Sequence, residues 1–335
     1  MSDTLTIFSP SGVLPEPAAA RRALRHLRGL GFEATLDASA LARHQRFAGD
    51  EATRLAALHR VADAAPSVAL ALRGGYGLTR LLDGIDWPRI ARSIERGTRW
   101  VGYSDFTALH LAAIAHRALP AGPARSRSGS GAGGPGGGSS GGSGDGAGGS
   151  LGGLWAGPLA HDDFSRRPEQ GGVDDITESC FLEAMSGELE AVGFRTEAGF
   201  DGLEARGVLW GGNLTVLLAL LGTPHWPRIQ GGILFLEDVN EASYRTERAL
   251  LQLQQAGVLD RQRAVLLGDF SAAPKSPLDR GYTLKTVVAH LRSLTRTPIL
   301  TGLPFGHVPT KVCLPVGRRS SLWVQGRDVL LGWGH

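Results

Sequence analysis

Short apolar runs alternate with amphipathic stretches through the first 120 residues of the chain. The apolar runs predict strands at 5–8, 32–36, 68–72 and 99–102. The third run, Val-Ala-Leu-Ala-Leu, is typical of a strand that is buried on both faces of a parallel sheet. Apolar residues at helical spacing predict helices over 18–30, 50–64, 78–82 and 106–118, with Asp50 as the expected N-cap of the second. This alternation indicates a doubly wound α/β domain on a parallel sheet.

The pattern after residue 165 also mixes strands and helices, but its strands are shorter and more numerous. Predicted strands cover 208–210, 232–237, 263–267 and 299–301, and predicted helices cover 214–221, 244–256 and 282–294. The segments 322–324 and 329–331 predict a closing hairpin. We therefore expect a smaller, β-rich α/β domain over 166–335, joined to the N-terminal domain at 1–120 by a connection at 154–165.

Glycine is unevenly distributed along the chain. Sixteen of the 48 glycines lie between residues 121 and 153, a stretch with almost no apolar side chain. Such a stretch cannot bury enough apolar surface to offset the entropy that ordering costs. We expect 121–153 to be a disordered Gly/Ser-rich insertion that carries no chemistry.

The charge balance is nearly even, with 35 lysine and arginine residues against 32 aspartate and glutamate residues. No block of like charges occurs, so a nucleic-acid or membrane-surface partner is not expected. Two cysteines, Cys180 and Cys313, are too few for a disulfide framework and fit a reducing compartment. The first residues lack the pattern of a signal peptide, and no apolar run reaches about 18 residues, so we expect a cytoplasmic protein.

One loop at the carboxyl end of a predicted strand carries a candidate nucleophile. In Gly102-Tyr-Ser-Asp105, Ser104 would stand on a tight turn between a strand and a helix. The backbone N–H of Asp105 would then face a developing oxyanion, as in a nucleophile elbow. The alternative is that Ser104 or Asp105 caps the following helix, because both residue types are favoured N-caps.

A second loop, Arg73-Gly-Gly-Tyr-Gly77, follows the buried strand at 68–72. Its glycines allow close approach of a ligand and present N–H groups to an anion. Neither a Gly-x-Gly-x-x-Gly fingerprint nor a Walker lysine is present, so a nucleotide site is poorly supported. A strand-to-helix turn that needs positive φ angles is the alternative.

A nucleophilic serine needs a general base and a carboxylate to orient that base. His307 is the candidate base because it stands in a glycine- and proline-shaped loop, although a structural role is the alternative. Glu237 is the candidate carboxylate, since it ends an apolar strand where a charge must be solvated or paired. Asp238 and Glu241 follow closely and leave this choice open. No histidine or cysteine spacing typical of a metal site occurs, so we expect no metal.

Several short motifs, taken in order, resemble those of the LD-carboxypeptidases. These are serine peptidases that include muramoyltetrapeptide carboxypeptidase and the microcin-immunity peptidases. The motifs are Phe47-Ala-Gly-Asp50, Arg73-Gly-Gly-Tyr-Gly77, Gly102-Tyr-Ser-Asp-Phe-Thr107, Gly157-Pro158, Gly211-Gly-Asn-Leu214, Leu220-Leu-Gly-Thr223, Leu236-Glu-Asp238 with Tyr244-Arg245, and Gly306-His307 with Leu314-Pro-Val-Gly317. Each is weak alone, but their common order is specific, and the likeness covers nearly the whole chain except the glycine-rich stretch.

The resemblance implies a Ser–Glu–His triad of Ser104, Glu237 and His307, with the backbone N–H groups of Gly75 and Asp105 as the oxyanion hole. It also implies a class I amidotransferase-like N-terminal domain, a homodimer, and no need for a metal or cofactor. The implied reaction releases terminal D-alanine from a cytoplasmic murein tetrapeptide during peptidoglycan recycling.

The chain departs from the family in two places. Many relatives have His-Gly-Pro where this chain has Ala156-Gly157-Pro158, and the glycine-rich insertion is not usual. One alternative function is an immunity-type peptidase that cleaves a peptide–nucleotide conjugate with the same chemistry. Another is a non-catalytic ligand-binding α/β protein.

Overall fold

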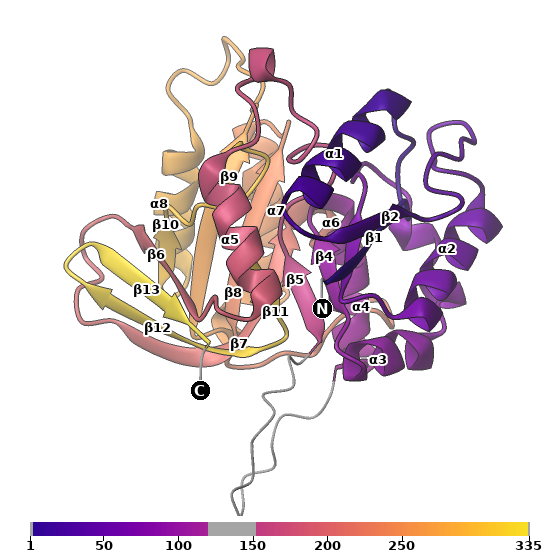
Figure 1. Ribbon diagram of the computed structural model, residues 1–335. Coiled ribbons are helices and arrows are strands. Elements are labelled where there is room, and N and C mark those ends of the chain that lie inside the picture. The colour runs from indigo at the N-terminus through magenta and orange to yellow at the C-terminus, as the bar shows by residue number, and fades with distance from the viewer. Residues whose placement is uncertain (1–2, 120–151, 334–335) are drawn as a thin grey trace, which may run out of the picture.

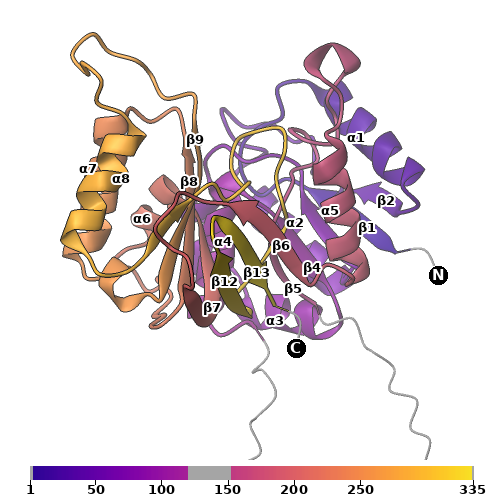
Figure 2. The ribbon, with the colours of Figure 1, turned by 90° about the vertical axis from the view of Figure 1, so that its left-hand side faces the viewer.

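Two β-sheets lie next to each other in the computed structural model, and helices cover both (Figures 1 and 2). The structure describes residues 3–119 and 152–333. The expected insertion at 121–153 lies outside these ranges, except for Gly152 and Gly153.

The first sheet has six strands in the order β11-β5-β4-β3-β1-β2. The strands are β1 (Thr4–Phe8), β2 (Glu33–Leu36), β3 (Val68–Ala71), β4 (Arg99–Gly102), β5 (Gly153–Ala156) and β11 (Leu314–Val316). Strands β1 to β5 pair in parallel, and β11 runs antiparallel to β5. Every residue of β3 and β4 is buried, which explains the wholly apolar sequence of β3. The parallel, doubly wound sheet predicted for this part of the chain is confirmed.

The helices of this part are α1 (Pro17–Gly29), α2 (Glu51–Ala64), α3 (Trp87–Glu95) and α4 (Thr107–Ala115). Their starts follow from the sequence, because Pro17 opens α1 and Asp50 caps α2 by accepting a 2.8 Å hydrogen bond from the Thr53 N–H. The Asp50 cap is therefore confirmed. Helix α4 contacts β5 in the first sheet and β7 in the second, so it joins the two sheets.

The helix expected over 78–82 was a wrong prediction. The chain forms two 3₁₀ helices there instead, Leu78–Arg80 and Leu82–Gly84. The segment lies between two glycines, Gly77 and Gly84, and is too short to propagate an α-helix.

The second sheet has seven strands in the order β10-β9-β8-β7-β12-β13-β6. They are β6 (Ala191–Arg195), β7 (Glu204–Asn213), β8 (Ile233–Val239), β9 (Ala264–Ser271), β10 (Ile299–Thr301), β12 (Arg319–Gln325) and β13 (Asp328–Gly332). Strands β7 to β10 pair in parallel, whereas β7, β12, β13 and β6 pair antiparallel. The closing hairpin is confirmed as β12 and β13. The helices here are α5 (Asp175–Ser186), α6 (Leu214–Ala219), α7 (Ser243–Gln255) and α8 (Leu284–Leu294).

Three elements after residue 152 belong to the first sheet or pack beside it. Strands β5 and β11 complete that sheet, although they come from the expected connection and from the expected C-terminal domain. Helix α5 places the Phe181 ring 5.8 Å from the ring of Phe32, next to β2. Of these three elements, only β11 comes after the strands β6 to β10, so with β11 the chain crosses back to the first sheet after it has built most of the second.

Candidate active site

Ser104 lies at the carboxyl end of β4, where the strand turns into a short 3₁₀ helix, Ser104–Phe106, ahead of α4. Its backbone has a φ of 62°, which is an unfavourable value for a residue with a side chain. This sharp turn leaves the serine side chain half-buried at the end of a buried strand. The geometry matches the strained turn of a nucleophile elbow.

The helix-capping interpretation of Ser104 and Asp105 is wrong. Neither side chain makes a capping hydrogen bond to the 3₁₀ helix or to α4. The Asp105 carboxylate turns back instead and accepts a 2.9 Å hydrogen bond from the N–H of Leu78. Asp105 thus links the end of the glycine loop at 73–77 to the turn at Ser104.

The glycine loop after β3 packs directly on Ser104. A Cβ atom at Gly74 would lie 2.8 Å from both the Cβ and the Oγ of Ser104, so any side chain at that position would force the loop or Ser104 to move. Gly75 and Gly77 have φ angles of 97° and 147°, so the positive φ angles that the alternative interpretation, a strand-to-helix turn, requires are present in this loop. The Gly12 N–H donates a 3.0 Å hydrogen bond to the Gly74 carbonyl and holds the loop from the other side.

His307 lies in the loop after β10, and its side chain contacts Glu237 in β8. The Nδ1 atom of His307 lies 2.7 Å from the Oε2 atom of Glu237, which is fully buried. A carboxylate only accepts hydrogen bonds, so Nδ1 carries the proton and Nε2 is left as the basic nitrogen. The other carboxylate oxygen, Oε1, accepts a 3.1 Å hydrogen bond from the Asn213 side chain, whose residue pairs with Glu237 in the β7–β8 ladder.

The charges around His307 favour its protonated form. Burial alone lowers the pKa of His307, but the hydrogen bond and charge of Glu237 oppose it. The negative charges of Asp162 and Asp238 act in the same direction, so the pKa is raised above its ordinary value of 6.5. An imidazolium that forms during a reaction is therefore stabilised at this position.

The two other candidate carboxylates have further partners, although Asp238 shares the Asn213 amide with Glu237 and accepts a 3.0 Å hydrogen bond from it. Asp238 accepts hydrogen bonds from the backbone N–H and the hydroxyl of Thr215, at 3.1 and 2.8 Å. Glu241 pairs with Arg245 one helical turn further on. Of the three carboxylates, the one that contacts the His307 ring is Glu237.

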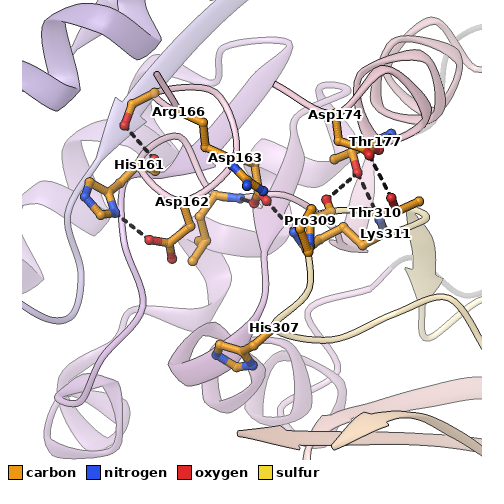
Figure 3. A network of polar contacts seen from close by, with 12 residues as sticks. His161, Asp162, Asp163, Arg166, Asp174, Thr177, His307, Pro309, Thr310 and Lys311 are labelled. Carbon is orange, nitrogen blue, oxygen red and sulfur yellow. Dashed lines mark hydrogen bonds and ion pairs between the residues drawn. The ribbon is translucent and has the colours of Figure 1, made fainter. Parts of the chain in front are cut away.

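Side chains from α5 and from its N-cap residue, Asp174, hold the loop that carries His307 (Figure 3). The Thr177 hydroxyl donates a 2.9 Å hydrogen bond to the Pro309 carbonyl and accepts one of the same length from the Lys311 N–H. The Thr310 hydroxyl donates to the Asp174 carboxylate at 2.7 Å. Three contacts within five residues of His307 thus fix the course of the loop.

A buried ion pair joins this loop to the rest of the site (Figure 3). The Lys311 ammonium pairs with the Asp163 carboxylate, and both side chains are almost completely buried. The same ammonium lies 5.2 Å from the centre of the Tyr103 ring, and that ring meets the His307 ring edge to face at 4.8 Å. Because Tyr103 immediately precedes Ser104, these contacts connect the candidate nucleophile and the candidate base.

The sequence patterns did not indicate that Asn213, Asp163 and Lys311 belong to the candidate active site. Asn213 belongs to the motif Gly211-Gly-Asn-Leu214, but its bond to Glu237 depends on strand pairing. Lys311 and Asp163 are 148 residues apart and have no local pattern that relates them. Within 3–119 and 152–333, no group of three or more histidine, cysteine, aspartate and glutamate side chains is arranged to hold a metal ion.

Two protein-family models match this chain, one in its N-terminal part and one in its C-terminal part. The LD-carboxypeptidase N-terminal domain matches residues 5–121, and the LD-carboxypeptidase C-terminal domain matches residues 206–322. The chain belongs to the LD-carboxypeptidase family. This LD-carboxypeptidase is 30% identical to the murein tetrapeptide carboxypeptidase of Pseudomonas aeruginosa over 315 residues, which cover 92% of this chain and 86% of the relative.

Solved structures with the same fold include a second member of the family. The crystal structure of muramoyltetrapeptide carboxypeptidase from Oxalobacter formigenes has a TM-score of 0.81 and 34% identity to this LD-carboxypeptidase, over 99% of each chain. MccF in complex with glutamyl sulfamoyl guanosine has a TM-score of 0.77 and covers 99% of this chain and 96% of its own, at 19% identity. At that identity the likeness shows a shared fold alone.

The family assignment confirms the peptidase class that the ordered motifs indicate. It also confirms the expected fold, a parallel-sheet α/β domain followed by a β-rich one. In the described part of the chain, none of the helices has the length and apolar character that crossing a membrane requires.

Proposed function

We propose that this LD-carboxypeptidase releases terminal D-alanine from murein tetrapeptides through an acyl-enzyme on Ser104. The observation that carries the proposal is the His307–Glu237 hydrogen bond, which leaves Nε2 of the imidazole basic. The strained Ser104 turn beneath a glycine loop supports the same assignment. The relationship to the Pseudomonas aeruginosa and Oxalobacter formigenes enzymes supports the substrate class.

In the proposed first step, the Ser104 Oγ attacks the carbonyl carbon that precedes D-alanine, and His307 Nε2 takes the hydroxyl proton. Glu237 holds the imidazole in its correct tautomer and stabilises the imidazolium that forms. The backbone N–H groups of Gly75 and Asp105 stabilise the oxyanion. The imidazolium then gives its proton to the amine of D-alanine, which leaves.

In the second step, water attacks the acyl-enzyme while His307 acts again as the base. The products are a murein tripeptide and free D-alanine. The chemistry needs no metal or cofactor, since the protein supplies the nucleophile, the base and the oxyanion donors. We also propose that the enzyme works in the cytoplasm as a homodimer, as the family resemblance implies. Cell fractionation and sedimentation of the purified protein test these two points.

The direct test is release of D-alanine from purified murein tetrapeptide by the full chain, measured with a D-amino-acid oxidase assay. A murein pentapeptide and a microcin-type peptide–nucleotide conjugate are the controls. The proposal predicts turnover of the tetrapeptide and little turnover of either control. Preferred cleavage of the conjugate would support the immunity-type alternative, and no hydrolysis of any of the three would contradict the proposal.

A further inference from the structure

A peptidase that removes one terminal residue must accommodate a free carboxylate close to the bond it breaks. Bond lengths place the carboxylate carbon of a one-residue leaving group within about 4 Å of the scissile carbonyl carbon. Removing this negative charge from water is costly unless a cation or several donors meet it. The inference rests on the proposed function and concerns which side chain supplies that cation.

Two cationic side chains near the candidate nucleophile, Lys311 and Arg54, already bind other groups of the protein. Lys311 is almost completely buried and paired with Asp163. Arg54 is fully buried behind the glycine loop, where its Nη1 donates to the carbonyls of Pro10 and Gly77 at 3.1 and 2.8 Å. Neither side chain can meet an incoming peptide without leaving its contacts.

Arg73 is placed differently. It is the first residue of the glycine loop and is partly exposed to solvent. Its Nη1 donates a 2.9 Å hydrogen bond to the Val13 carbonyl and lies 3.2 Å from the point where a Cβ at Gly75 would stand. The guanidinium therefore lies beside Gly75, one residue from the glycine that packs on Ser104.

Asp162 is a carboxylate on which the charges of both Arg73 and the candidate base act. Burial raises the pKa of the Asp162 carboxyl, but its hydrogen bond to His161 and the positive charges of Arg73 and His307 outweigh burial and lower it. The charges of Arg73 and His307 thus act on the same carboxylate. Among the described residues, the Val13 carbonyl is the acceptor that Arg73 contacts, so most of its five N–H groups face no protein acceptor.

We propose that the Arg73 guanidinium binds the terminal carboxylate of the substrate and so restricts the site to chain ends. A guanidinium presents parallel N–H groups that match the two oxygens of a carboxylate. Held beside Gly75, it would receive the carboxylate while the scissile carbonyl oxygen points to the oxyanion donors. The specificity for a terminal residue would then come from the same loop that stabilises the transition state.

The test compares two substrates that differ only in this charge. They are murein tetrapeptide with a free D-alanine carboxylate and the same peptide with a C-terminal D-alanine amide. Release of D-alanine or of its amide is measured for the wild type, Arg73→Met and Arg73→Lys. Arg46→Met is the matched control, because Arg46 is an exposed arginine that lies over the neighbouring Tyr76 ring, 5.8 Å from its centre.

The proposal predicts that Arg73→Met lowers kcat/KM for the acid about 10- to 100-fold and hardly affects the amide. The preference for the acid therefore disappears in Arg73→Met, is partly kept in Arg73→Lys and is unchanged in Arg46→Met. Circular dichroism confirms folding, and Arg73→Gln, which can still donate to Val13, replaces Arg73→Met if that variant does not fold.

Two results would overturn the proposal. An equal loss on both substrates in Arg73→Met would mean that Arg73 merely supports the loop through Val13. Loss of the preference in Arg46→Met would move the assignment to Arg46. These outcomes differ from failure of the proposed function, in which the wild type would release neither D-alanine from the acid nor D-alanine amide from the amide.

Discussion

A methyl group added at Gly74 probes how tightly the glycine loop packs on the nucleophile. The added Cβ would lie 2.8 Å from Ser104 Oγ, whereas ordinary contact begins at 3.4 Å, so one of the two must move by about 0.6 Å. The φ angle of Gly74 is not positive, so Gly74→Ala introduces a clash and no backbone strain. A displacement of this size near the reacting atoms costs about 10²-fold in rate.

We expect Gly74→Ala to lower kcat for D-alanine release about 10²-fold and to reduce the free energy of unfolding by about 1–3 kcal/mol. Steady-state kinetics and urea unfolding measure the two effects. The matched control is Gly29→Ala, since an added Cβ at this exposed end of α1 meets nothing within 4 Å. That variant should keep wild-type kcat. A folded Gly74→Ala enzyme with kcat within threefold of the wild type would refute the packing argument.

Three further changes test the parts of the site that surround the serine. Glu237→Gln should damage kcat far more than Asp238→Asn, because the hydrogen bond to the His307 ring comes from Glu237; the reverse ranking would move the assignment by one residue. In the wild type, kcat/KM should rise with pH along a limb whose midpoint lies above 6.5, because the raised pKa of His307 keeps the base protonated below it. Glu237→Gln should move that midpoint to lower pH in a pH–rate profile, and an unmoved midpoint would assign the limb to another group. Lys311→Met should cost about 3–5 kcal/mol in urea unfolding, because it leaves the buried Asp163 charge unpaired, whereas adding Asp163→Leu should recover much of the loss. If Lys311→Met alone had the same free energy of unfolding as the wild type, the buried ion pair would not stabilise the fold as described.

Much of the first sheet could be predicted because strands buried on both faces are apolar and short. Strand β4 was predicted with the bounds that the structure has, and β3 within one residue. Strand β11 was missed because its three residues, Leu314–Val316, include a proline and run antiparallel at the sheet edge. Strand β7 was predicted too short, since polar residues alternate through the half that pairs with β12.

The limits of prediction at the site have a similar physical origin. Glu237 and Asp238 are consecutive in β8, where the pairing with β9 is irregular, and both carboxylates accept a hydrogen bond from the Asn213 amide. The simple alternation of strand side chains therefore does not separate them, and only the packed structure decides which carboxylate meets His307. The capping interpretation of Ser104 failed because a preference for helix starts cannot reveal a positive φ angle. The Lys311–Asp163 pair depends on a loop that returns to the first sheet late in the chain.

The most direct test of the central claim is the turnover of murein tetrapeptide by Ser104→Ala. The hydroxyl is the proposed nucleophile, and the backbone around it stays the same, so the account predicts a fall in kcat of about 10⁴-fold or more in a protein that unfolds like the wild type. If the folded Ser104→Ala enzyme kept more than about a tenth of the wild-type turnover, Ser104 would not be the nucleophile.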